Sequence, residues 1–297
     1  MGRSLFVAPG VSVVSAALRA LSVALLVTLV SWTLVECAPG TSAERAAIAA
    51  RAIVPGDLDM PKSVRDSIVT QIGEKHGLHS SFPARLAKQS LGLLRLDFGS
   101  SWRDERTVRG IVFSRAGLLS LVICLLSLAL GAIAGTFVAL ATAKRPESAG
   151  HRSFSVLAAL VLSLPLPWLA MVLASSFSYG SPFSFMPLGG GSASSLILPL
   201  LVMAAVPAVV IWRHLHKELA RQSGAAWVLS AKARGVGESM LWSKHILRAS
   251  VPNLLSLLPV LLAYLFGAIL LVERVFAIEG LGETISRAAA AGDAPVL

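Results

Sequence analysis

Charged residues are scarce in this sequence. Only 14% of its 297 residues are charged, whereas 55% are hydrophobic. Soluble domains carry about 25% charged residues, so this chain has too few to cover a globule of its size. The composition excludes a soluble globular protein and indicates an integral membrane protein.

Acidic residues are outnumbered: 16 Asp and Glu stand against 26 Lys and Arg, a formal net charge of +10. Such an excess is compatible with a nucleic-acid partner. Membrane proteins, however, concentrate Lys and Arg in their cytoplasmic loops. The positions of the basic residues along the chain distinguish the two interpretations.

Cysteine is nearly absent, because Cys37 and Cys124 are the only two. Cys124 lies in an apolar run, so no disulfide framework is indicated. Cys37 follows an apolar segment, as in lipoprotein signals, but Glu36 occupies the position where such signals have a small residue. The same segment could be a cleaved signal peptide. "WTLVECAPGTSAE" offers no clean small-x-small cleavage site beside the apolar run, which favours a retained span.

Five segments are apolar enough to cross a bilayer, which takes about 20 residues of helix. The second span is the clearest and contains Gly131 and Gly135, at a spacing that lets helix backbones approach closely. We predict an all-α polytopic membrane helix bundle. Its five spans are Ala20–Val35, residues 116–143 between Arg115 and Lys144, Phe154–Phe177, Leu196–Trp212 and Ala249–Val272.

The loop charges predict the orientation of these spans. Basic residues follow the second and fourth spans, whereas residues 178–195 carry no charge. The positive-inside rule then places the N-terminus and residues 213–248 in the cytoplasm. Residues 37–115 lie outside. The helical spacing of Val64, Ile68 and Ile72 predicts a small, mostly helical extracytoplasmic insertion there.

The stretch "SAKARGVGESMLWSKHILR", Ser230 to Arg248, reads as two short amphipathic helices separated by Gly235 and Gly237. Apolar residues recur at helical spacing on both sides of the glycines. Such a pair could fit a groove in a partner or rest on lipid headgroups, and the residues alone leave both open. The apolar positions are Trp227, Val228 and Ala231, then Leu241, Trp242, His245, Ile246 and Ala249.

This stretch resembles the EAA loop of the permease subunits of bacterial ABC importers. Leu229, Ser230 and Ala231 stand at the EAA positions, Gly235 at the glycine, and residues 245–247 at the distal end. "ARG…KHILRAS" is most similar to the B-type permeases of the dipeptide, oligopeptide and nickel branch. Leu229 replaces the usual Glu, which weakens the match.

Four further segments resemble the same family, in its order along the chain. They are "CAPGTSAE" after the first span, "LDFGSSWRDERTV" before the second, "LVERVFAIEGLGETI" after the fifth, and "AGDAPVL" at the end. The family continues after the last of these with a sixth span. Because the sequence stops at Leu297, we expect either a truncated chain or a degenerate permease.

The resemblance implies a multi-pass permease subunit of the bacterial cytoplasmic (inner) membrane, not an enzyme. No "GxxxxGK[ST]" phosphate loop occurs, so ATP hydrolysis falls to other subunits. The implied partners are a second homologous permease subunit, two cytoplasmic ATP-binding subunits, an extracytoplasmic substrate-binding protein and membrane lipid, with no nucleic acid, cofactor or metal. The implied docking residues are Trp227, Ser230, Ala231, Gly235, Gly237, Leu241, Trp242, His245 and Leu247.

The expected domains are residues 1–36 with the first span, the insertion 37–115, and a permease core 116–297 that contains the coupling loop 213–248. Peptides are the expected cargo, with nickel or another small solute as the alternative. A membrane scaffold without transport activity would explain the spans and basic loops equally well, but not the ordered family segments.

Several polar residues allow either a functional or a purely structural interpretation. His76 and His79 could bind a metal but read better as surface residues, since no third ligand is evident. His214 and His216 point to different helix faces and read as interfacial. Glu273 ends the fifth span and could face a gate, although a carboxylate at the outer interface is the simpler expectation.

Overall fold

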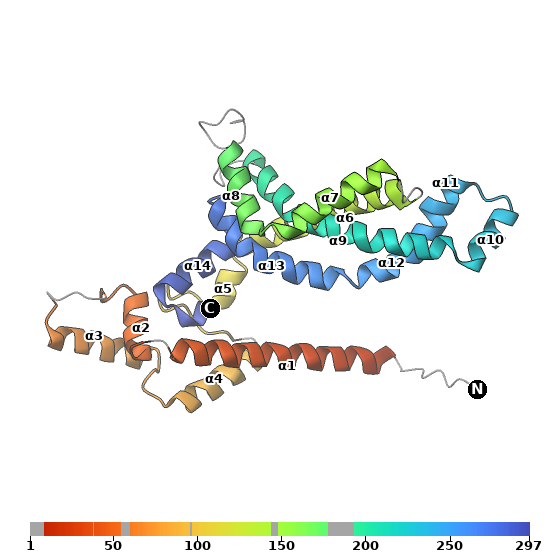
Figure 1. The fold of residues 1–297 in the computed structure, drawn as a ribbon. Coiled ribbons are helices and arrows are strands. Elements are labelled where there is room, and N and C mark those ends of the chain that lie inside the picture. The colour runs from red at the N-terminus through yellow and green to blue at the C-terminus, as the bar shows by residue number, and fades with distance from the viewer. Residues whose placement is uncertain (1–8, 38, 55–59, 96, 144–147, 178–192) are drawn as a thin grey trace. The chain divides into compact units, whose positions relative to one another are not determined.

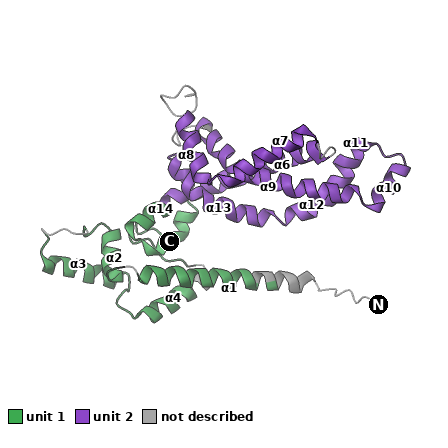
Figure 2. Ribbon diagram, viewed as in Figure 1, with its two compact units in different colours: residues 1–114, 285–297 green, residues 115–284 purple. Residues whose placement is uncertain are grey.

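The structure is a computed structural model that describes residues 9–37, 39–54, 60–95, 97–143, 148–177 and 193–297. Within these ranges every regular element is helical and no strand forms. The chain divides into two compact units, residues 1–114 with 285–297, and residues 115–284 (Figure 2). The prediction of an all-α protein is therefore confirmed.

The first unit begins with α1 (Pro9–Glu36), whose apolar residues 18–36 form a candidate span. The helices α2 (Ser42–Ala49), α3 (Lys62–Lys75), α4 (Phe82–Leu94) and α5 (Val108–Val112) follow. The insertion is thus helical, as predicted. Glu36 ties the end of α1 to α2 and α4, because it forms ion pairs with Arg45 (3.2 Å) and with Arg85.

The last residues of the chain pack into the same unit. Asp293 is buried and accepts hydrogen bonds from the Ser101 hydroxyl (2.5 Å) and the Trp102 N–H (2.9 Å). Ala294, in η3 (Ala294–Val296), joins a small apolar core with Trp102 and residues of α2. Two segments singled out in the sequence, "LDFGSSW" and "AGDAPVL", therefore meet. The structure groups residues 285–297 with this unit, whereas the sequence placed them in the permease core.

The second unit is built around α6 (Arg115–Ala143) and α9 (Ile197–Ser223). A Cβ atom on Gly131 would lie 2.7 Å from Pro207 Cβ, and one on Gly135 would overlap the Ala208 carbonyl oxygen. The two backbones therefore touch at both glycines, as their spacing predicted. Beyond Trp212, α9 continues as a helix to Ser223, so three basic residues predicted in a loop, Arg213, Lys217 and Arg221, are helical.

The predicted third span is two helices instead of one. α7 (Ala149–Ser163) and α8 (Leu166–Phe177) meet at an angle of 102°. Pro165 sits in the break and Pro167 in the first turn of α8; proline lacks the N–H that would continue the hydrogen-bond ladder of α7. The predicted third span, Phe154–Phe177, thus coincides with a bent helix pair that counts as one span if α7 and α8 cross together.

The predicted fifth span also differs. α12 (Leu247–Leu255) and α13 (Leu258–Val275) are separated by two residues, and Pro259 occupies the first turn of α13, where proline is well tolerated. In the described residues four helices are long and apolar enough to cross a membrane, or five if α7 and α8 form one span. The polytopic bundle is confirmed; most of the predicted uncharged loop, residues 178–192, lies outside the described residues.

Candidate functional site

α10 (Ala226–Ala233) is the first helix of the glycine-containing stretch, and it lies at one end of the second unit (Figure 1). It ends in a Schellman motif: the Gly235 N–H donates to the Lys232 carbonyl (2.9 Å) and the Val236 N–H to the Ala231 carbonyl (3.2 Å). Val236 is partly buried against the neighbouring apolar core, the contact that usually accompanies this motif.

The two glycines differ in conformation. Gly235 has φ +81°, in the left-handed region that glycine reaches without steric cost. Gly237 has φ −62° and ψ 143°, which any residue can adopt. Gly235 therefore makes the turn, and Gly237 only precedes the next helix.

The second helix is longer than the sequence suggested. α11 (Glu238–Met240) runs into η2, a π-helical turn (Leu241–Ile246), and then into α12 without a break in helical backbone. A π-helical turn inserts one extra residue per turn and is frequent at functional sites. The predicted pair of short helices is thus one short helix and one helix that leads directly toward the last span.

The inner face of this loop packs on the chain itself. Val228 and Ala231 of α10 are buried at 3% and 5% exposure, and Leu241 and Ile246 of η2 have none. They share a core with residues of α9 beyond the apolar part of that helix, including Leu215 and Leu219. Ala231 and Leu241 pack the loop against α9, and their predicted contact with a partner stays a prediction.

Three large apolar side chains of the loop are exposed. Leu229 is 73% exposed, Met240 47% and Trp227 38%, and we call these three residues together the docking surface, as a candidate for contact with a partner. The other predicted docking residues are exposed or partly buried around it. Ser230 and His245 are exposed, whereas Trp242 and Leu247 are partly buried. Sequence reasoning did not include Met240, and took Leu229 only as a departure from the motif.

Glu273 lies in the last turn of α13 and is not exposed. It is fully buried, and it accepts hydrogen bonds from the Ser120 hydroxyl of α6 and from the Glu283 N–H (3.1 Å) in the first turn of α14 (Leu281–Ala291). The Ser120 oxygen in turn accepts from the Leu281 N–H (2.7 Å). A carboxylate at a helix N-terminus compensates its free N–H groups. Glu273 is therefore covered by protein on the side that faces α14, and its roles as an interfacial carboxylate or a gate stay predictions.

Two glycines make room for this carboxylate. A Cβ on Gly280 would overlap the Glu273 carboxyl group, and one on Gly282 would lie 2.9 Å from its Oε2 atom. The spacing of "ERVFAIEGLGE" therefore has a structural reason. Glu273 lies in the last turn of α13, and Gly280 and Gly282 let the following chain pass close to its carboxyl group.

The histidines predicted at the surface do not gather into a metal site. His79 Nε2 lies 3.3 Å from the Thr70 carbonyl oxygen, and the His76 ring lies 6.4 Å from that of Trp102. Burial, reinforced by the charge of Lys75, lowers the pKa of His76. In the described part of the chain, no three His, Cys, Asp or Glu side chains are close enough to share a metal ion.

Comparison with known proteins supports the family suggested by these segments. A protein of Brucella abortus (strain 2308), provisionally named as a peptide transport system permease protein, is 25% identical over 288 residues, or 94% of this chain and 87% of that one. The metal-staphylopine import system permease protein of Staphylococcus aureus is 23% identical, over 79% of this chain and 75% of its own.

The dipeptide transport system permease protein of Lactococcus lactis is 27% identical over 172 residues, which cover 58% of this chain and 56% of that protein. The family model for the binding-protein-dependent transport system inner membrane component matches residues 127–297, more than half of the chain. This range holds α9, the glycine turn and the Glu273 segment. The chain belongs to the binding-protein-dependent transport system inner membrane component family.

Proposed function

We propose that this permease couples ATP hydrolysis on separate cytoplasmic subunits to solute movement through its helix bundle, and that the docking surface receives that motion. The observation that carries the proposal is the division of one loop into a buried face and an exposed apolar face. Leu229 is 73% exposed on α10 while Ala231, two residues later, is 5% exposed. These apolar groups lie outside the candidate spans, which supports a surface that a partner covers.

The loop is connected to two candidate spans, α9 and α13, to which it can pass on movement. Its buried face is anchored on α9, and its second half continues through η2 into α12, which precedes the candidate span α13. A displacement of α10 by a partner is therefore passed to two spans, one by packing and one by the backbone. Packed interfaces of this kind shift between discrete arrangements rather than deform continuously.

The proposed assembly contains a second homologous permease subunit, two ATP-binding subunits and an extracytoplasmic substrate-binding protein. The proposed cargo is a dipeptide or oligopeptide, because two of the relatives above are named as peptide permeases. A small solute or metal complex is the second candidate, since the Staphylococcus aureus relative is named for metal-staphylopine import.

The docking role is tested by Met240→Glu, which puts a charge on an exposed apolar side chain of the loop without touching its buried face. We expect recovery of the ATP-binding subunits, pulled down with the solubilised permease and normalised to its amount, to fall at least tenfold. Ala220→Glu is the matched control, because it adds the same charge at an exposed position of α9 outside the docking surface. Equal recovery of the ATP-binding subunits with the wild type, the docking variant and the Ala220→Glu control would mean that the loop only rests on lipid.

The cargo is tested separately by uptake into cells that lack the native system and express the reconstituted complex. Labelled di- and tripeptides are expected to enter in an ATP-dependent manner. Uptake of a nickel or other metal chelate in their place would assign the second cargo and leave the docking proposal intact.

A further inference from the structure

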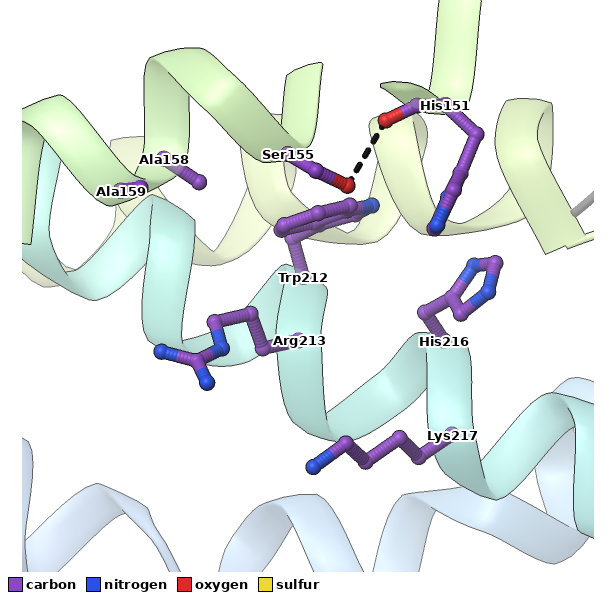
Figure 3. Close-up of a pocket in the computed structure, with 8 residues that line it drawn as sticks. All are labelled: His151, Ser155, Ala158, Ala159, Trp212, Arg213, His216 and Lys217. Atoms are coloured by element: carbon purple, nitrogen blue, oxygen red, sulfur yellow. Dashed lines mark hydrogen bonds between the residues drawn. The ribbon is translucent and has the colours of Figure 1, made fainter. Parts of the chain in front are cut away.

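A cavity of about 350 Å³ opens between α7 and α9 (Figure 3). Its wall on α9 includes Trp212, the last residue before the cluster of cations on that helix, and its wall on α7 lies in the first turns of that helix. Both walls therefore lie where apolar segments give way to charged ones. In a membrane this is the level of the lipid headgroups, where tryptophan is also enriched.

Two cations border this cavity, and no described carboxylate forms an ion pair with them. Arg213 and Lys217 are exposed and line it, and both also line an adjoining cavity of about 200 Å³. No salt bridge forms to either side chain within the described ranges. The carboxylate nearest in sequence, Glu218, instead accepts hydrogen bonds from Arg221 (2.9 Å) and Gln222 (2.8 Å). The site therefore favours an anion over a metal cation.

The wall behind these cations is rigid and aromatic. The His151 and His216 rings stack with centroids 4.5 Å apart, and the Trp212 indole N–H donates to the Thr142 hydroxyl (3.1 Å). His216 Nδ1 lies 3.3 Å from the same hydroxyl oxygen. Among the described residues, the buried Nδ1 atom of His151 has no hydrogen-bond partner.

The remaining wall is apolar, with Ala158 and Ala159 of α7 in the cavity (Figure 3). A free inorganic anion gains nothing from such a surface, because its own groups are all polar. A phospholipid uses both halves of the site: the phosphate meets the cations, and the glycerol and upper acyl chain lie against the alanines and the indole. Lysine and arginine at this depth extend toward the headgroups on their long aliphatic stems.

We propose that this cavity binds the headgroup phosphate of an anionic phospholipid. By the charge of the loops it belongs to the cytoplasmic leaflet, where anionic lipids attract basic residues with about fivefold affinity for each charge. The site is distinct from the docking surface, and it depends on the membrane location of the chain rather than on its cargo. A lipid seated there would contact α7 and α9 together.

The test is native mass spectrometry of the permease complex in detergent, titrated with phosphatidylglycerol or with phosphatidylcholine. The wild type is expected to retain phosphatidylglycerol preferentially. The double variant Arg213→Gln, Lys217→Gln should lose that preference by about twentyfold or more, since two charges are removed. Both side chains are exposed, so their neutralisation leaves packing unchanged; elution of the complex in gel filtration verifies this.

Two matched variants separate the site from general charge. Arg248→Gln removes one exposed charge from α12, outside the cavity, and should keep the preference. Arg213→Lys keeps the charge in the cavity, so this variant should also keep the preference for phosphatidylglycerol. Full phosphatidylglycerol retention by the double variant would overturn the proposal. So would complete displacement of the lipid by millimolar inorganic phosphate, because that outcome assigns the cavity to a free anion.

Discussion

The two glycines between α10 and α11 are not equivalent, and Gly235→Val tests the difference. Gly235 is held at φ +81°, where a β-branched residue is disfavoured by about 1–2 kcal/mol. The variant should change the angle between α10 and η2, and pull-down of the ATP-binding subunits with the permease should drop severalfold at an unchanged membrane level.

Gly237→Val is the control for this prediction. Gly237 has ordinary φ and ψ, and nothing lies within 4 Å of the position its Cβ would take. Wild-type pull-down is expected. Equal losses with both variants would show that side-chain bulk near the loop, rather than the left-handed turn, is responsible.

Gly280 leaves the space that the Glu273 carboxyl group occupies, so a larger residue at position 280 should lower the stability of the protein. In Gly280→Ala the new methyl group overlaps the Glu273 carboxyl group, which is buried and hydrogen-bonded on both sides. We expect a loss of about 1–3 kcal/mol, the range for overpacking a buried position. Thermal unfolding of the purified protein in detergent measures it.

Gly267→Ala provides the comparison, because this glycine lies within α13 with nothing within 4 Å of its Cβ direction. Alanine favours helix by about 1 kcal/mol over glycine, so this variant should be neutral or slightly more stable. A Gly280→Ala protein as stable as Gly267→Ala would show that the carboxylate does not need the space that the glycine leaves.

At the scale of elements, the packing of α6 on α9 governs the second unit. In Gly135→Val the side chain would meet the α9 backbone at the Ala208 carbonyl, and backbone cannot rotate out of the way as a side chain can. The helices must separate, with a loss of at least about 1–3 kcal/mol. Membrane accumulation of the full-length chain, measured by immunoblot, should fall strongly.

Ala134→Val adds similar bulk to the neighbouring position of α6, which is exposed and faces away from α9. Accumulation near the wild-type level is expected for this variant. If Ala134→Val were as damaging as Gly135→Val, the effect would come from the helix propensity of valine and not from contact with α9.

At the scale of the whole molecule, the topology prediction requires residues 37–115 and 213–248 to lie on opposite sides of the membrane. In a Cys37→Ser background, Lys62→Cys should react with an impermeant thiol reagent added outside, and Glu238→Cys should react only after the membrane is permeabilised. Both positions are exposed, and Cys124 is buried and should stay silent. The reverse labelling pattern would invert the orientation and move the docking surface to the outside.

The amino-acid sequence by itself determined the features that depend on composition and local chemistry. A bilayer admits only segments that satisfy their backbone groups internally and expose apolar side chains, so the runs around α1, α6, α9 and α13 had to be helices. Glycine is the residue that tolerates both a left-handed turn and helix contact. The roles of Gly235 and of the Gly131–Gly135 pair therefore followed from their spacing.

Only the tertiary structure decided which face of each element is covered. Leu241 and Leu229 are equally apolar, yet the first is fully buried against α9 and the second is mostly exposed, because the extension of α9 beyond Trp212 covers one side of the loop. In the sequence, Glu273 has the pattern of a surface acid. In the structure it is buried, because Ser120, 153 residues earlier, and the N–H groups of α14 surround it. Burial depends on contacts between segments that are distant in the sequence, and the hydrophobicity of a single segment does not predict those contacts.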